Sequence, residues 1–82
     1  MTAWLRCRLD TGMFSDEAAV TYPPDSSDWQ KSVFVPRAFI REESGHKGSV
    51  RVEVVVKDGM QFAVLPSSQR DIVKIDAAAD LQ

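Results

Sequence analysis

The fold is decided by residues 50–65, which read Val50-Arg51-Val52-Glu53-Val54-Val55-Val56-Lys57-Asp58-Gly59-Met60-Gln61-Phe62-Ala63-Val64-Leu65. Valine fills every second position of the first half, and charged residues fill most positions between, as is typical of a strand with one face on a core. Asp58-Gly59 predicts a two-residue turn, because both turn positions take positive φ. Residues 60–65 follow as the return strand, with Phe62 expected on its core row, and Pro66 ends it. The stretch therefore predicts a β-hairpin.

Four further segments carry strand patterns. Residues 3–9 and 18–22 alternate apolar side chains with polar or small ones, and residues 31–35 and 71–75 are short and rich in β-branched residues. No helical periodicity appears, so the sequence predicts an all-β domain of six short strands. Closing such strands into a barrel hides their edges.

The connections between these strands differ in kind. We expect a long loop over residues 10–16 and a polar loop over residues 42–49, which holds two glycines. Residues 37–41 fit either a bent strand or a helical turn. Residues 67–70, Ser-Ser-Gln-Arg, fit a single 3₁₀ turn with Ser67 as its cap. The Ala-rich end, residues 76–82, has room for one loose turn.

The chain has 82 residues, one cysteine and a net charge of −2, so it predicts one domain over residues 1–82, with a core over 3–76 and a tail over 77–82. An internal disulfide and a multi-cysteine zinc site are excluded, and with one histidine we expect no metal and no cofactor. The start of the chain lacks a secretory pattern and no window is apolar enough to span a membrane, so we expect a cytoplasmic protein.

The order of these parts resembles an SH3-like barrel. In such a barrel, a hairpin with a long loop is followed by a middle strand, a tight distal hairpin, a 3₁₀ turn and a closing strand. The resemblance covers residues 3–76. It implies an all-β fold, a small, partly open SH3-like barrel of five to six strands with a single 3₁₀ turn before the last strand. The aromatic motif and tryptophan pair of the SH3 ligand groove are absent, so the resemblance implies no ligand.

Two short segments carry a second resemblance, Gly12-Met13-Phe14-Ser15-Asp16-Glu17 and Ser32-Val33-Phe34-Val35-Pro36. They are similar to small uncharacterised bacterial proteins of mobile gene cassettes (integron cassettes), a group that implies no activity. One mobile-element SH3-like family, the type II dihydrofolate reductases, builds its active site with a Val-Gln-Ile-Tyr strand. The closing strand here reads Ile72-Val73-Lys74-Ile75, so that activity is not supported.

Aromatic side chains off the core rows are the candidate binding residues. Trp4 shares a row with two arginines, Phe14 lies in the long loop, and Trp29 follows a polar loop. Exposed rings of this kind form interfaces or ligand platforms, or fold back to cover the ends of a barrel. We therefore expect binding through Phe14, Trp29 and Trp4, and a contact between copies of the chain through Trp4 and Val55.

These observations favour a non-catalytic binding or adaptor module that self-associates, with a protein or small ligand as partner. Cys7 falls on an apolar row and His46 in a glycine-bounded loop, so neither is expected to be catalytic. One alternative is an enzyme or small-ligand protein whose site forms across subunits, from Arg37, Lys74 or His46. The other is a nucleic-acid-binding barrel, which requires six scattered cations to converge: Arg37, Arg41, Lys47, Arg51, Lys57 and Arg70.

Overall fold

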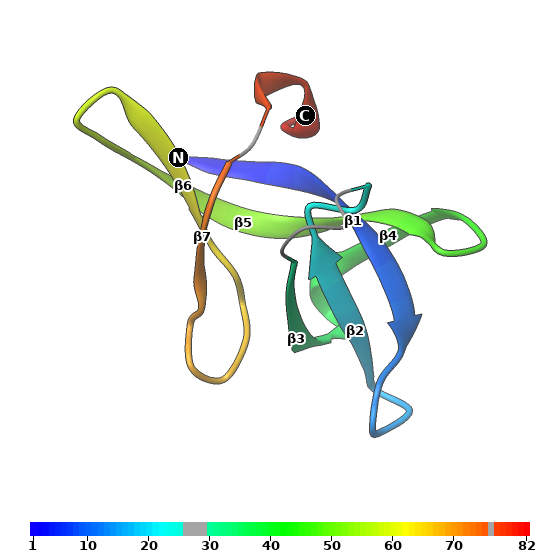
Figure 1. The fold of residues 1–82 in the computed structure, drawn as a ribbon. Coiled ribbons are helices and arrows are strands. Elements are labelled where there is room, and N and C mark those ends of the chain that lie inside the picture. Colours follow the sequence, from blue (N-terminus) through cyan, green and yellow to red (C-terminus); the bar gives the residue numbers. More distant parts are fainter. Residues whose placement is uncertain (26–29, 76) are drawn as a thin grey trace.

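The structure is a computed structural model that describes residues 1–25, 30–75 and 77–82. It is a small, nearly closed antiparallel β-barrel, consistent with an SH3-like barrel (Figure 1). Its strands are β1 (Thr2–Thr11), β2 (Glu17–Tyr22), β3 (Lys31–Pro36), β4 (Ile40–Ser44), β5 (Lys47–Lys57), β6 (Met60–Val64) and β7 (Ile72–Lys74). They pair in the order β3-β2-β1-β5-β6-β7, and β4 pairs with β5 beside this path. Two 3₁₀ turns complete the described part, η1 (Arg37–Phe39) and η2 (Ala78–Asp80).

The predicted central hairpin is confirmed as β5 and β6. Asp58 and Gly59 have φ angles of 54° and 77°, as a turn with two left-handed residues requires. Lys57 therefore pairs with Met60, and Val55 pairs with Phe62. This register sets the face on which every later side chain of β6 lies.

The core joins the inner faces of the long strands. Fully or nearly fully buried side chains come from β1, β2, β3, β5, β6, β7 and the segments that flank β7. The largest with almost no exposure are Tyr22, Leu5, Leu65, Val20, Val35 and Val50. Two expected core residues lie elsewhere. Val56 is 63% exposed, because β5 runs past the end of the barrel there. Phe62 is half-buried on the outer face, because it lies directly opposite outward-facing Val55 while Ala63 points inward.

The predicted polar loop over residues 42–49 is wrong. Residues 40–44 form β4 and pair with the start of β5, so the connection shortens to residues 45–46. The side chains of residues 41–44 are all exposed, and without an apolar row the strand has no signal in the sequence. For residues 37–41 the sequence left a bent strand and a helical turn as alternatives. Both occur, since residues 37–39 form the 3₁₀ turn η1 and residues 40–41 begin β4.

Residues 67–70, where the sequence predicts a 3₁₀ turn, form a hydrogen-bonded turn, and the 3₁₀ turns of the described residues lie instead at η1 and η2. The Arg70 N–H donates to the Ser67 carbonyl over 3.0 Å. Ser67 also caps the turn, since its Oγ accepts the Asp71 N–H at 3.1 Å and donates to Asp71 Oδ2 at 2.7 Å. Arg70 has a φ of 51°, which a residue with a Cβ adopts only at a cost.

β3 and β7 are the end strands of the sheet, and an ion pair links β3 to the residue before β7. Lys31 Nζ lies 3.2 Å from Asp71 Oδ1. The C-terminal residues return to the other side of the barrel. Leu81 forms a bridge with Leu5, and Gln82 exchanges two backbone hydrogen bonds with Trp4, of 2.9 and 3.2 Å.

Candidate functional groove beside strand β5

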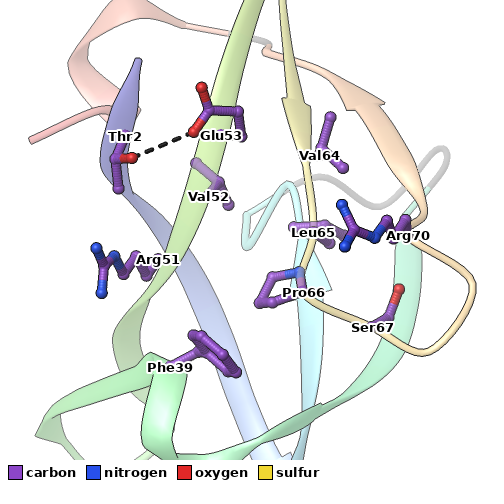
Figure 2. Close-up of a pocket in the computed structure, with 10 residues that line it drawn as sticks. All are labelled: Thr2, Phe39, Arg51, Val52, Glu53, Val64, Leu65, Pro66, Ser67 and Arg70. Atoms are coloured by element: carbon purple, nitrogen blue, oxygen red, sulfur yellow. Dashed lines mark hydrogen bonds between the residues drawn. The ribbon is translucent and has the colours of Figure 1, made fainter.

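An open groove of about 360 Å³ lies between β5 and the segment that follows β6 (Figure 2). Val52, Val64, Leu65 and Pro66 supply its apolar surface, and Phe39 stands at one end. Its remaining lining is polar and charged, from Thr2, Arg51, Glu53, Ser67 and Arg70. An apolar groove with a few charged groups at its margin is typical of a binding site.

The groove exists because β5 changes partners along its length. Its first residues pair with β4 and its last with β6, and the β6 ladder ends where Glu53 pairs with Val64. Continuing that register by two residues would place Arg51 opposite Pro66. Proline has no N–H to donate, so the ladder stops and the chain turns away from β5.

The backbone of Arg51 faces this groove. Val54 exchanges hydrogen bonds with Met1 on the β1 side, the Val54 N–H donating over 2.6 Å. Backbone polar groups alternate sides along a strand, so those of Arg51 point away from β1, toward the interval between Phe39 and Pro66. The groove is therefore bordered by strand backbone as well as by side chains.

The positive charges around the groove lack ion-pair partners among the described residues, whereas the negative charges have them. Among the described residues, neither Arg51 nor Arg70 takes part in an ion pair, whereas the neighbouring carboxylates do. The Met1 ammonium, 2.6 Å from Glu53 Oε1, and the Thr2 hydroxyl hold the pKa of Glu53 below its usual value. Hydrogen bonds from Ser67 and then Lys31 hold the pKa of Asp71 below its usual value. The free charge at the groove is thus positive.

Trp4 lies on the outer face of β1, as predicted, directly opposite Arg51. The Arg41 guanidinium covers its ring, 3.9 Å from the ring centroid, so one indole face is already occupied. Ser49, opposite Arg6 and Arg41 in the two ladders, is 1% exposed, and its Oγ has no hydrogen-bond partner among the described residues. Trp4 and Arg41 form one margin of the surface that contains the groove.

The other predicted binding residues are not brought to this groove. Phe14 is 65% exposed in the connection after β1, at the opposite end of that ten-residue strand from Trp4. Trp29 lies outside the described residues. Val55 is 46% exposed on the outer face of β5, away from the groove lining. Phe39, Pro66 and the position of Arg70 were not predicted from the sequence. The hairpin register places Pro66 opposite Arg51, and this alone would have predicted that the β6 ladder ends beside the groove.

The residues named for an enzyme site are placed in two different regions. Arg37 and His46 line one hollow of about 160 Å³ with Asp10 and Glu42, whereas Lys74 lies on β7. The His46 Nδ1 is 3.0 Å from both the Leu9 carbonyl and Asp10 Oδ1, and the imidazole is 70% exposed. Arg37 is held by Glu42, at 2.9 Å, and by the Ser15 carbonyl. Among the described residues of this lining, Thr11 has the only hydroxyl, and the hydrogen bonds of His46 go to Leu9 and Asp10 instead.

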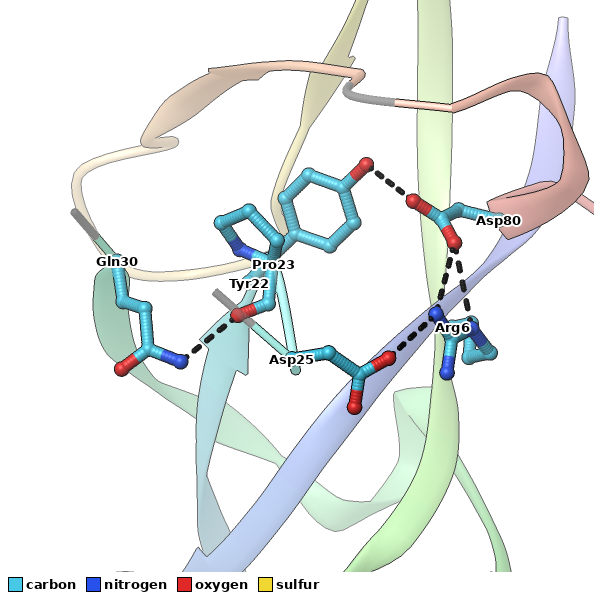
Figure 3. Close-up of polar contacts among 6 residues, drawn as sticks. All are labelled: Arg6, Tyr22, Pro23, Asp25, Gln30 and Asp80. Carbon is cyan, nitrogen blue, oxygen red and sulfur yellow. Dashed lines mark hydrogen bonds and ion pairs between the residues drawn. The ribbon is translucent and has the colours of Figure 1, made fainter. Parts of the chain in front are cut away.

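A buried carboxylate ties the C-terminal turn to the barrel (Figure 3). Asp80 is 5% exposed, and its Oδ2 accepts the Tyr22 hydroxyl at 2.7 Å. Its Oδ1 lies 3.2 Å from both Nε and Nη2 of Arg6. Arg6 also binds the exposed Asp25 at 2.9 Å, and this bond, ahead of those to Asp80, raises the pKa of the guanidinium. We interpret the network as a structural latch, because the buried Asp80 carboxylate is compensated by the Arg6 guanidinium and the Tyr22 hydroxyl.

Cys7 is buried in the core, and burial raises the pKa of its thiol to about 12. At about pH 8 only about one thiol in ten thousand is then ionised, and the thiolate is the reactive form. We expect the native protein to resist a thiol reagent such as dithionitrobenzoate for hours, while the protein unfolded in guanidinium reacts within minutes. Rapid labelling of the folded protein would contradict this assignment.

The described residues contain no group of three or more histidine, cysteine, aspartate or glutamate side chains placed to hold a metal ion. Within the same part of the chain, no helix is long and apolar enough to cross a membrane. Comparison with known proteins found no matching family model, no matching curated protein and no matching solved structure.

Proposed function

We propose that this protein is a non-catalytic binding module that pairs with a second copy of itself. The observation that carries the proposal is an apolar surface on the outside of the barrel, which we call the outer strip: Val55, Phe62, Val64 and Ile72. Val55 and Ile72 are 46% and 62% exposed, and the other two are half-buried. The resemblances to SH3-like barrels and to bacterial cassette proteins imply no activity, so the proposal is based on the exposed apolar surface.

The outer strip suits a contact between identical chains. Val55 lies opposite Phe62 and Val64 lies opposite Ile72, so the four side chains are neighbours on three adjacent strands. Charged residues border the strip, Glu53 and Lys57 on β5 and Lys74 on β7. A two-fold axis through such a face would cover each strip with the other and bring charges of both signs to the rim.

Analytical ultracentrifugation at micromolar concentration tests the pairing. We expect the protein to sediment as a dimer and Val55→Glu to sediment as a monomer, because a carboxylate would be buried without a partner in the contact. Val56→Glu is the matched control, since Val56 is 63% exposed at the next position but on the opposite face.

Two results of the sedimentation experiment would contradict the proposal in different ways. A monomeric wild-type protein would remove the self-association, and equal dissociation by both variants would move the contact away from the outer strip. Trp4 stays a prediction as an interface residue, which Trp4→Ala in the same experiment addresses.

A further inference from the structure

The groove beside β5 is a second surface, and we propose that it binds an acidic peptide segment of another protein, with one apolar side chain flanked by carboxylates. The groove goes beyond the proposed self-association, because most of its lining lies outside the outer strip; Val64 alone belongs to both. Three features of the groove carry the inference: its shape, its charge and the backbone of Arg70.

The shape suits an apolar side chain. The groove holds about 360 Å³ and is surfaced by Val52, Val64, Leu65 and Pro66, with Phe39 at one end. Figure 2 shows this surface between the β5 ribbon and the segment that follows β6. The backbone of Arg51 borders the same space at the point where β5 lacks a strand partner on the β6 side. An extended peptide could therefore lie along β5 and place its apolar side chain over the valines.

The charge selects the flanking residues of the ligand. Arg51 and Arg70 lie at opposite margins of the groove in Figure 2, where the Arg70 guanidinium leans toward the apolar lining and the Arg51 guanidinium points outward. Among the described residues neither has an ion-pair partner. The carboxylates nearby, Glu53 and Asp71, are already bound to Met1 and to Ser67 and Lys31. Two unmatched guanidinium groups on either side of an apolar surface are complementary to carboxylates on either side of an apolar residue.

The backbone of Arg70 indicates that this arginine is placed for a purpose other than stability. Its φ of 51° lies in the region that glycine adopts freely and arginine does not. The turn would form at least as easily with glycine at this position. The strain is offset by the Ser67–Asp71 hydrogen bonds that hold the turn, and it aims a cationic side chain at the groove.

The same features favour a peptide over a nucleic acid. Arg41 already covers one face of the Trp4 ring, so the indole is not an open platform for base stacking. Of the six cations that nucleic-acid binding would require to converge, Arg51 and Arg70 line this groove while Arg37 is bound to Glu42.

The test is a titration of ¹⁵N-labelled protein followed by amide chemical shifts at about 20 mM salt, where charge contacts are least screened. The probe is a synthetic peptide of about nine residues with a central leucine between aspartates and glutamates. Its controls are the same peptide with serine for leucine, the same peptide with lysine for the acidic residues, and an oligothymidylate of about ten nucleotides. We expect saturable shifts at Phe39, Arg51, Val52 and Leu65 with the first peptide, and at least about ten-fold weaker binding of every control.

Protein variants separate the groove from the outer strip. Arg70→Gly should weaken peptide binding at least about ten-fold while the midpoint of thermal unfolding does not fall, because glycine accepts the left-handed backbone. Arg51→Gln should weaken binding similarly. Lys57→Gln with Lys74→Gln removes two charges outside the groove and should leave binding unchanged. Val55→Glu should abolish pairing and keep peptide binding, so the two proposals fail independently.

Several results would overturn the inference. Tighter binding of the oligothymidylate than of the acidic peptide would make the groove a nucleic-acid site. Equal loss of binding with the Lys57 and Lys74 substitutions would show non-specific charge attraction. Absence of shifts at the groove with every probe, in a folded protein, would show that the groove does not bind such peptides.

Discussion

Replacing Asp80 with asparagine is expected to lower the free energy of unfolding by about 2–4 kcal/mol. Asp80 is 5% exposed and accepts hydrogen bonds from both Tyr22 and Arg6, so the neutral amide loses two hydrogen bonds to a buried carboxylate and leaves the guanidinium with the exposed Asp25 alone. The estimate is below that for a fully buried pair, because the Arg6 side chain is 45% exposed and water screens it. A domain of this size has a net stability of only about 3–5 kcal/mol, so the variant would be partly unfolded at room temperature.

Asp25→Asn is the matched control for this prediction. It makes the same chemical change on the same arginine, but the Asp25 side chain is 77% exposed, and we expect a loss below about 1 kcal/mol. Urea unfolding followed by circular dichroism measures both variants. A loss for Asp80→Asn no larger than that for Asp25→Asn would show that the latch does not stabilise the barrel.

Gly48→Ala is expected to cost about 2–3 kcal/mol. A Cβ at this position would lie 2.5 Å from the Arg41 carbonyl oxygen and would also meet the Leu9 side chain. The carbonyl belongs to the β4–β5 contact and Leu9 to the core, so neither moves without disturbing the pairing of three strands.

Ser49→Ala tests the neighbouring position with a substitution of similar size. Ser49 is 1% exposed and its Oγ has no hydrogen-bond partner in the described part of the chain, so removing this hydroxyl should leave the free energy of unfolding unchanged or raise it by up to about 1 kcal/mol. The same urea experiment compares the two variants. A Gly48→Ala protein as stable as Ser49→Ala would mean that β4 can move away from β5 without penalty.

The central hairpin shows how far the sequence leads. The Asp-Gly turn and the alternating valines predicted β5, β6 and their link, and the turn angles confirm it. The same two-residue turn also determines that Phe62 lies opposite Val55, and hence outside the barrel, and that Arg51 would lie opposite Pro66. The outward position of Phe62 and the end of the ladder were therefore contained in the sequence, because register follows from turn length.

Other elements could not be predicted in this way. The exposed side chains of residues 41–44 follow no apolar period, so β4 became visible only through its pairing with β5. The burial of Asp80 depends on Tyr22 and Arg6, which lie 58 and 74 positions earlier in the chain. Local patterns carry no information about a contact of that span, and an aspartate beside alanines gives no sign of a buried partner.

The return of the chain's last described residues to its first strand also bears on when the barrel can form. β1 lies between β2 and β5, and its early residues are completed by Leu81 and Gln82, while Asp80 reaches back to Arg6. Contacts between the two ends of a chain make folding slow for its length. During synthesis on the ribosome, the latch therefore cannot close until Asp80 has left the exit tunnel. Until then Arg6 on β1 lacks its contact with the Asp80 carboxylate.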